Sequence, residues 1–266
     1  MSNTKQIQVP TMAEIAAKGE NPEILFWVGC AGAFDDRYKK VTRDFIRILE
    51  KIGMKYAVLG TEESCTGDPA RRAGNEFLFQ MQAMTNIEVL NAYNVKKIVT
   101  ACPHCFNTLK NEYPELGGNY EVIHHSTFLQ QLLDNGKLKI SGGDFKGKKI
   151  TYHDSCYLGR GNDIYTAPRS VVEALDADLV EMKRCKSKGL CCGAGGAQMF
   201  KEPEPGNKDV NVERTEDAIE TNAEIIATAC PFCLTMMEDG VKAHNKEGKL
   251  HVFDLAELVS SAENLR

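Results

Sequence analysis

The chain has 266 residues, of which 42% are hydrophobic and 26% are charged, and its formal net charge is −5. This composition is ordinary for a folded globular protein and shows no basic stripe, so we expect no nucleic-acid partner. There is no apolar run near the roughly 20 residues of a membrane span and no secretory signal, so we expect a cytoplasmic protein that a partner can hold at the inner face of a membrane.

Strands and helices are predicted to alternate after residues 1–22, an N-terminal extension with one short surface helix at 12–18. Apolar, β-branched runs predict the first-half strands at 24–30, 55–60, 96–102 and 121–126. Helical spacing of apolar residues predicts helices at 36–52, 68–93, 105–113 and 127–134. The apolar residues spaced along the second of these helices are Phe77, Met81, Met84 and Leu90.

The same order returns after a Gly- and Lys-rich linker at 135–149. The second-half strands are predicted at 148–156, 178–182, 224–230 and 250–255. Its helices are predicted near 163–175, 209–222, 231–245 and 254–261. Strands that alternate with helices indicate βαβ units. We therefore expect an α/β fold of two pseudo-symmetric, Rossmann-like halves, each a short, mostly parallel sheet flanked by helices.

Ten cysteines are the most informative feature of the composition. A reducing compartment does not keep structural disulfides, so these thiols point to metal binding or redox chemistry. Scattered buried thiols are the alternative, and the internal repeat argues against it. Cys30 corresponds to Cys156, Cys65 to Cys192, and TACPHC at 100–105 to TACPFC at 228–233. The repeat defines two domains: 23–140 with four of the repeated cysteines, and 147–266 with five.

The predicted strands place these cysteines at one edge of each sheet. Four of them fall at predicted strand ends: Cys30, Cys102, Cys156 and Cys230. Ligands of open α/β sheets bind beyond the carboxyl ends of the strands, so the thiols can converge. Pro103 and Pro231 suit a first helical turn, which puts Cys105 and Cys233 near the positive end of a helix, where a thiol pKa is lowered.

The number of thiols separates the candidate metals. A CxxC pair with two distant cysteines fits zinc or an iron–sulfur cluster. In the second half Cys191 and Cys192 are adjacent, and the resulting five thiols exceed the four ligands of tetrahedral zinc. The glycines that begin at Gly193 let the backbone approach a cluster. A Gly-rich turn with one spare thiol is the weaker alternative.

The complete second-half motif is similar to a known family. C-x34-CCG-x36-CPFC, with YHDSCYLGR at 152–160 and CCGAGG at 191–196, resembles the cysteine-rich CCG domain. That domain occurs in the B-type component of heterodisulfide reductase and in iron–sulfur subunits of glycolate or lactate oxidation and of electron-transfer-flavoprotein-linked reductases. The resemblance implies a [4Fe–4S] cluster, of the noncubane type, in the second half. Its ligands would be Cys156, Cys191, Cys192, Cys230 and Cys233.

The first half departs from this motif at Ser64, where the complete motif has a second thiol. The remaining cysteines can hold a second [4Fe–4S] cluster or a zinc ion, and Ser64 is a candidate to fill the gap. These four ligands are Cys30, Cys65, Cys102 and Cys105. His104 lies between the last two, which makes it a candidate by position alone.

Polar residues near the cysteines are candidate neighbours of a cluster. They are His153, Asp154, Ser64, Gly193, Asn211 and Arg214. For 153–154, and for the histidines at 124–125, we favour the satisfaction of backbone groups at strand ends over a role at a cluster. A solvated helix face is equally compatible with Asn211 and Arg214. Cys185 lies outside the repeat and is expected to be a loop or core thiol.

The leading functional hypothesis is an iron–sulfur electron-transfer subunit of a multi-subunit oxidoreductase. No GxGxxG, P-loop or ferredoxin cysteine run is present, so electrons would pass through partners. We expect a flavin-dependent dehydrogenase or electron-transfer flavoprotein on one side and a quinone-linked acceptor on the other, with ferredoxin-type or membrane iron–sulfur subunits as partners. One alternative is a catalytic disulfide reductase component of the heterodisulfide reductase B type, with the cluster as active site. The other is a zinc-stabilised scaffold without a redox role.

Overall fold

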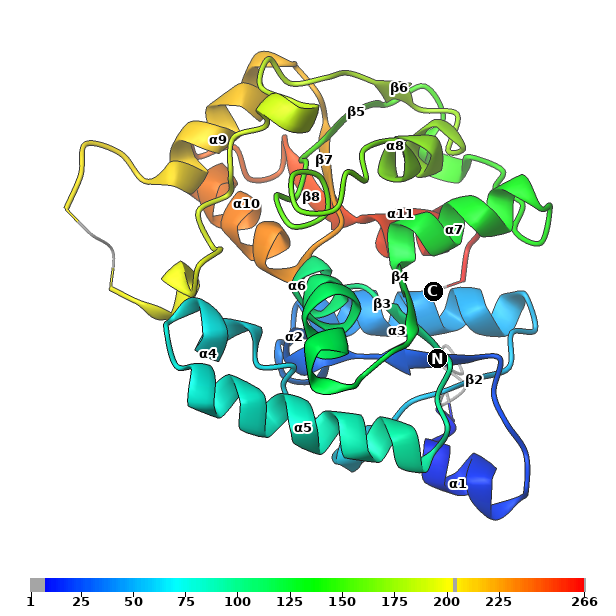
Figure 1. Ribbon diagram of the computed structural model, residues 1–266. Helices are drawn as coiled ribbons and strands as arrows, with labels where there is room; N and C mark the ends of the chain where they lie inside the picture. Colours follow the sequence, from blue (N-terminus) through cyan, green and yellow to red (C-terminus); the bar gives the residue numbers. More distant parts are fainter. Residues whose placement is uncertain (1–7, 203–204, 266) are drawn as a thin grey trace.

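Two parallel sheets form the centre of the protein. A computed structural model describes residues 8–202 and 205–265 (Figure 1). The strand orders are β2-β1-β3-β4 and β6-β5-β7-β8, and every pairing between these strands is parallel. The two halves share one strand order and one pattern of helical connections. The expected α/β fold of two similar halves is therefore confirmed.

The first half contains a strand in each of the four predicted segments, each shorter than predicted, and more helices than the sequence indicated. The strands are β1 (Ile24–Trp27), β2 (Tyr56–Ala57), β3 (Lys97–Thr100) and β4 (Glu121–His124). The helices are α1 (Met12–Ala17), α2 (Gly29–Phe34), α3 (Tyr38–Lys51), α4 (Asp68–Arg72), α5 (Glu76–Ala92), α6 (Pro103–Asn107) and α7 (His125–Asp134). Helix α6 continues as a π-helical turn at Thr108–Glu112 and a 3-10 turn at Tyr113–Leu116.

The second half repeats this arrangement with fewer helices. Its strands are β5 (Lys149–Tyr152), β6 (Asp178–Leu179), β7 (Ile225–Thr228) and β8 (His251–Asp254). Its α-helices are α8 (Thr166–Glu173), α9 (Val210–Glu220), α10 (Pro231–Ala243) and α11 (Leu255–Ala262). The predicted linker packs against both halves through the buried side chains of Leu138 and Phe145.

The first strand ends earlier than predicted. Strand β1 stops at Trp27, and Cys30 lies in the first turn of α2 instead of at a strand end. Gly29 adopts φ +75°, a left-handed conformation that ends the extended chain at little steric cost. The predicted helix 68–93 is likewise two helices, because Gly74 at φ +85° ends α4 and Asn75 caps α5.

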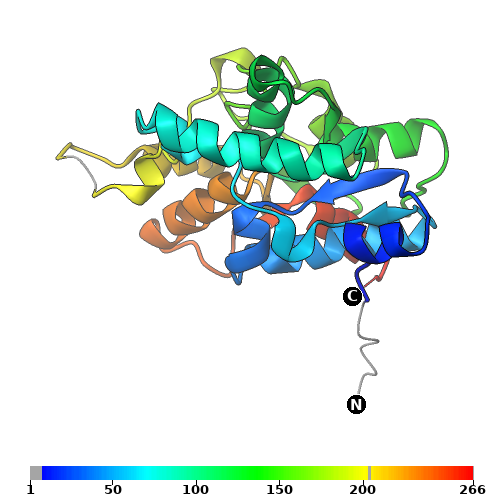
Figure 2. The same cartoon turned by 60° about the horizontal axis from the view of Figure 1, so that its bottom comes forward.

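Helix α5 has apolar side chains on two faces, and the predicted core face was mostly the wrong one. Phe77, Met81 and Met84 are exposed by 75%, 52% and 54%. Phe79 and Leu90 are buried, so only Leu90 of the predicted core positions packs inside. Figure 2 shows α5 along the outer surface of the first half. An apolar stripe therefore faces solvent there.

The N-terminal helix α1 is attached to the first sheet. Thr11 pairs in parallel with Val58, directly after the edge strand β2. Met12 is buried in the core of the same half. Thr11 and Glu14 form a capping box that starts the helix. The described part of the N-terminal extension thus continues the first half.

Equivalent helices join the two halves. Helix α3 packs against α11, and α8, the counterpart of α3, packs against α7, the counterpart of α11. Buried polar contacts cross the same interface. The Tyr38 hydroxyl donates to Asp254 Oδ2 at 3.2 Å, and His125 Nε2 lies 2.9 Å from Asp254 Oδ1. The sheets are therefore locked together by core packing on both sides of a pseudo-two-fold axis.

Candidate metal centres

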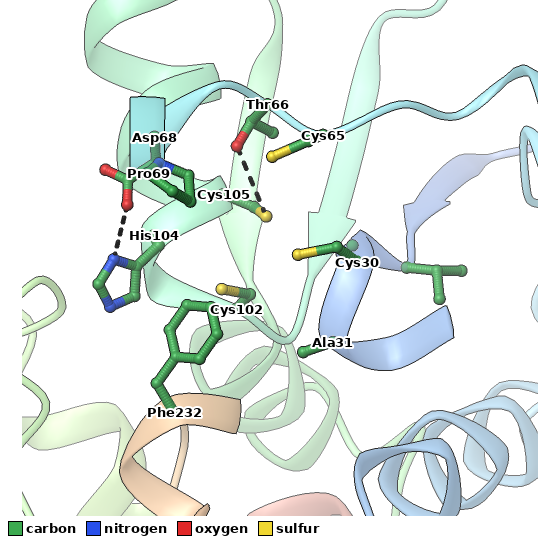
Figure 3. A pocket seen from close by; sticks show the side chains of 12 residues that line it. Cys30, Ala31, Cys65, Thr66, Asp68, Pro69, Cys102, His104, Cys105 and Phe232 are labelled. Carbon is green, nitrogen blue, oxygen red and sulfur yellow. Dashed lines mark hydrogen bonds and ion pairs between the residues drawn. The ribbon is translucent and has the colours of Figure 1, made fainter. Parts of the chain in front are cut away.

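Four first-half cysteines converge on one pocket (Figure 3). Cys30 comes from the first turn of α2 and Cys65 from the loop before α4. Cys102 precedes α6, and Cys105 lies within it. Their side chains point toward the same space, which lies beyond the carboxyl ends of the strands. The structure thus brings together all four cysteines that the sequence selected in this half.

A half-buried carboxylate, that of Glu63, lies beside the turn that carries Cys30. Glu63 accepts hydrogen bonds from the backbone nitrogens of Val28 and Gly29, at 3.0 and 2.6 Å. Burial raises the pKa of Glu63 to about 7. A Cβ atom at Gly29 would lie 3.4 Å from Cys105 Sγ, so the backbone closely approaches the sulfurs here. This close approach is the second reason for glycine at this position.

Ser64 is turned away from the sulfurs. Its hydroxyl donates to Asn86 Oδ1 at 2.9 Å, and Asn86 in turn donates to the Cys65 carbonyl and to the Tyr113 hydroxyl, both at 3.0 Å. Ser64 is not among the residues that line the pocket. Its place in the repeat corresponds to Cys191, but its oxygen is used to hold the loop.

The second-half cysteines form a more deeply buried group. Cys156 follows β5, Cys191 and Cys192 lie in the loop before α9, and Cys230 and Cys233 flank the first turn of α10. The Sγ atoms of Cys192 and Cys233 are 3.3 Å apart. Apolar side chains of Met199, Phe232 and Met236 pack around the group. Cys192, Cys230 and Cys233 are buried, whereas Cys156 and Cys191 are half-buried.

Gly193 shapes the loop beside this site. Its φ is +92°, and a Cβ atom there would lie 3.1 Å from Val210. Its backbone nitrogen donates to Cys191 Sγ at 3.3 Å. The sequence predicted close backbone approach at this glycine, and the structure shows that its N–H reaches a cysteine sulfur.

Each site contains a thiol whose pKa is lowered, although the pKa of most of the other thiols is raised by burial and neighbouring sulfurs. In each half one thiol donates to a close partner. The Cys30 thiol lowers the pKa of Cys65 to about 6, and the Cys156 thiol lowers the pKa of Cys191. Since the thiolate is the form that binds metals, both groups have the donor chemistry of a thiolate-bound iron–sulfur cluster or zinc ion.

His104 connects the two sites. Its Nδ1 lies 2.9 Å from Asp68 Oδ2, and its ring also hydrogen-bonds to Cys230 of the other half. Burial lowers the pKa of His104, but Asp68 and Cys230 outweigh this effect and raise it. Burial raises the pKa of Cys230, but hydrogen bonds from Cys233 and His104 lower it to about 5. The contact between His104 and Cys230 therefore favours the thiolate form of Cys230.

The polar residues that the sequence predicted near the second-half cysteines have different hydrogen-bond partners. Arg214 is fully buried and donates from Nε to His153 Nδ1 at 3.0 Å, so neither faces solvent. Burial and the charge of Arg214 lower the pKa of His153 to about 3. Asp154 instead forms a bidentate pair with Arg169, with both distances 2.9 Å. The Asn211 side chain donates to the Met236 carbonyl at 3.2 Å.

The remaining candidates are His124, His125 and Cys185. His124 and His125 are fully buried, and the His124 side chain caps α7. The two rings hydrogen-bond to each other, and His125 also bonds to Asp254 across the interface. Burial and the charge of Glu181 raise the pKa of Cys185, and no other cysteine is among the groups that shift it.

Sequence reasoning missed Glu63, Asp68, Tyr157 and Phe232. Each is adjacent or nearly adjacent to a predicted cysteine, which was the available signal. Their roles depend on contacts between segments far apart in the chain, such as the stacking of His104 on Tyr157.

The cysteine-rich architecture agrees with a comparison of protein families. The family model of the cysteine-rich domain, CCG, matches residues 24–110 and 150–238. These two segments contain all nine cysteines of the two sites. The chain belongs to the CCG family. The repeat found in the sequence is therefore a pair of CCG domains.

Curated relatives of this CCG chain include redox proteins. It is 48% identical to the EtfAB:quinone oxidoreductase of Syntrophomonas wolfei over 92% of this chain and 35% of that protein. It is 44% identical to the probable iron-sulfur-binding oxidoreductase FadF of Bacillus subtilis, over 96% of this chain and 36% of that protein. It thus spans about a third of the length of these two relatives.

A third relative is a component of the dihydromethanophenazine:CoB–CoM heterodisulfide reductase of Methanosarcina barkeri. The identity is 35% over 92% of this CCG chain and 60% of that protein. Among solved structures, glutamate racemase of Aquifex pyrophilus is 14% identical over 91% of this chain and 83% of that one, with a TM-score of 0.38. A likeness of this size says nothing about activity.

Proposed function

We propose that this chain is an iron–sulfur electron-transfer component of a larger oxidoreductase. The convergence of the five second-half cysteines carries this proposal. The sulfurs of Cys192 and Cys233 lie 3.3 Å apart, in a largely buried group that packs against apolar side chains. Five thiols are more than one tetrahedral zinc ion uses, and burial favours a group whose charge is shared over several atoms.

Each cysteine group has a defined role in this proposal. A noncubane [4Fe–4S] cluster would be held by Cys156, Cys191, Cys192, Cys230 and Cys233. A second [4Fe–4S] cluster or a zinc ion would be held by Cys30, Cys65, Cys102 and Cys105. A cluster supplies one-electron redox chemistry when bound. The chain supplies thiolate ligands, a dry surround and donors such as the Gly193 N–H, which stabilise negative charge on sulfur.

The relatives support a particular electron route. One relative is named for EtfAB and quinone, and another for iron–sulfur-binding oxidoreduction. We infer that electrons pass between an electron-transfer flavoprotein or flavin-dependent dehydrogenase and a quinone-linked acceptor. The partners would be a flavoprotein and ferredoxin-type or membrane iron–sulfur components, which would hold the chain at the inner face of a membrane. Within 8–202 and 205–265, no helix combines the length and apolar character needed to cross a bilayer.

Metal analysis tests the cofactor assignment. Iron, zinc and acid-labile sulfide would be measured on anaerobically purified protein, together with EPR spectra of oxidised and reduced samples. About four irons with sulfide indicate one cluster, and about eight indicate two. Zinc without iron or sulfide, after reconstitution with both, would overturn the proposal and leave the zinc-stabilised scaffold.

Matched cysteine variants test the ligand set. Cys192→Ser should remove the EPR signal and the iron of the second site, because Cys192 is buried among its sulfurs. Cys185→Ser is the control, since no other cysteine is among the groups that shift its pKa. Full iron retention in Cys192→Ser, or iron loss in Cys185→Ser, would contradict the assignment.

A disulfide reductase is the second candidate function, and one feature of the surface favours it. An apolar groove of about 320 Å³ lies beside Cys30 and is lined by Phe34, Phe200 and Phe232. It therefore adjoins both cysteine sites and has room for an organic disulfide. Rapid mixing of reduced protein with a mixed disulfide, and separately with a short-chain quinone, distinguishes the two functions. Fast reoxidation by the disulfide alone would favour the reductase.

A further inference from the structure

His153 lies at the wall of the second cysteine site. It directly follows β5 and its side chain is buried. One of its ring nitrogens lies within 4.8 Å of the Sγ atoms of Cys192 and Cys233. By position alone this imidazole is either a metal ligand or a hydrogen-bond donor, because histidine does both in proteins.

Arg214 decides between these two roles. Its guanidinium is fully buried and donates from Nε to His153 Nδ1 at 3.0 Å. A guanidinium has donors and no acceptor, so His153 Nδ1 must be the acceptor and carries no proton. The single proton of the neutral ring is then on Nε2. The contact also excludes the imidazolium form, in which both nitrogens are donors.

The guanidinium itself is held in place from the opposite side. Arg214 Nη1 donates to the Arg184 carbonyl at 2.6 Å and to Asp217 Oδ2 at 3.0 Å. Asp217 is also fully buried and binds the Arg184 guanidinium at 2.7 and 3.0 Å. Rotation of Arg214 away from His153 would break these bonds. The tautomer of His153 is therefore fixed by a chain of buried, paired charges.

The protonated nitrogen has no partner within the described residues. His153 Nε2 is buried and makes no hydrogen bond to them. Because Nδ1 already accepts from Arg214, Nε2 is the nitrogen that is free to donate to an acceptor at the cysteine site. A buried N–H without an acceptor is destabilising, so an acceptor at the cysteine site is expected.

We propose that His153 is a hydrogen-bond donor to the sulfur atoms of the second site, and that Arg214 positions it by fixing its tautomer. This inference rests on the proposed function, because it needs a sulfur-bound metal group at that site. An N–H directed at sulfur stabilises the added negative charge of the reduced state and raises the reduction potential. As a metal ligand, His153 would have to bind through the lone pair of Nε2. The ring proton would then lie on Nδ1 and would clash with the N–H that Arg214 donates to the same nitrogen.

The test compares reduction potentials of reconstituted protein. EPR-monitored titration would be carried out on the unmodified chain, His153→Leu and His153→Gln. We expect His153→Leu to shift the second-site potential to a more negative value with the iron content unchanged. His153→Gln keeps an N–H donor and should recover part of the shift. Replacement of the exposed His251 by Leu is the control and should leave the potential unchanged.

A spectroscopic measurement needs no variant of the site. Histidine labelled with ¹⁵N would be incorporated, and the hyperfine coupling of imidazole nitrogen to the second site would be measured. A weak coupling, with a nearby proton that exchanges in D₂O, supports the donor. A coupling typical of direct nitrogen ligation, or no change of potential in His153→Leu, would overturn the proposal. Absence of iron and sulfide from the unmodified chain would instead overturn the proposed function itself.

Discussion

The ring of His104 stacks on the ring of Tyr157, with 4.1 Å between the ring centroids. His104 lies between two first-half cysteines, and Tyr157 directly follows Cys156 of the second half. Phe232 meets the other side of the His104 ring edge-on at 5.0 Å. The two cysteine sites therefore share one aromatic wall, and we expect a change at His104 to act on both.

Replacement of His104 by Phe should alter the second-half site although residue 104 belongs to the first half. Phenylalanine keeps a ring against Tyr157 but loses the hydrogen bonds to Asp68 and Cys230. We expect a changed EPR spectrum of the second site and a loss of about 1–3 kcal/mol in the free energy of unfolding. Replacement of the exposed His251 by Phe is the control. An unchanged second-site spectrum would contradict the shared wall.

Gly193→Ala should weaken the second site. The left-handed φ of +92° and the 3.1 Å approach to Val210 both oppose a side chain here. We expect a loss of about 1–3 kcal/mol and faster removal of iron by a chelator. Gly195→Ala is the matched control, because a Cβ atom there meets nothing within 4 Å. Equal chelation rates for the two variants would show that the loop geometry does not matter.

Ser64→Cys should leave the metal content of the first site unchanged. The side chain at this position is directed to Asn86, so a thiol there is not aimed at the other sulfurs. Loss of the hydroxyl hydrogen bond should lower the free energy of unfolding by about 1 kcal/mol. Ser64→Ala loses the same bond without adding a thiol and serves as control. Extra iron bound by the cysteine variant alone would mean that the loop turns to offer a fifth ligand.

Stability should fall in mild acid because His124 is buried without charge. Burial, and then the charge of His125, lower the pKa of His124 well below 6.5. The folded state keeps this ring neutral, while the unfolded chain binds a proton below about pH 6.5. The neutral His124 ring therefore contributes fully to the free energy of unfolding above that pH. Below it, the contribution falls by about 1.4 kcal/mol per pH unit.

Urea unfolding between pH 7.5 and 5 measures this dependence. His124 hydrogen-bonds to His125, which in turn hydrogen-bonds to Asp254, so His124 is measured within this chain of contacts. His124→Gln should unfold at a lower urea concentration. Its free energy of unfolding should also change less with pH between pH 7.5 and 5. If the free energy of unfolding of the variant depends on pH as strongly as that of the unmodified chain, other groups cause the loss of stability in acid.

The cysteine sites were the most predictable part of the protein. Cys102 and Cys230 are fixed by a local motif, in which the following proline begins a helix, and the repeat supplied the rest of each set. The face of α5 was not predictable, because Phe77 and Phe79 are both apolar and periodicity does not tell which side meets the core. The direction of the Ser64 side chain was equally unpredictable, because it depends on a hydrogen bond to Asn86 that only the fold reveals.

Arg214 shows why the remaining roles need the fold. An arginine on a helix before a cysteine is ordinarily a solvated residue, and the sequence carries no sign of its complete burial. Its partners lie 3, 30 and 61 residues away, at Asp217, Arg184 and His153. Only the packing of α9 against the loop at 184 and the end of β5 brings them together.

The packing of helices of one half against helices of the other has a consequence for the evolution of the chain. Helix α3 needs α11 to cover it, and α7 needs α8. A single repeat on its own would leave both surfaces bare, whereas two copies related by a two-fold axis would bury them through one self-complementary contact. A gene for one repeat would therefore have encoded a homodimer, and duplication with fusion through residues 135–149 would have made that pairing permanent. Once fused, one copy was free to lose a ligand, as at Ser64, while the other kept its set.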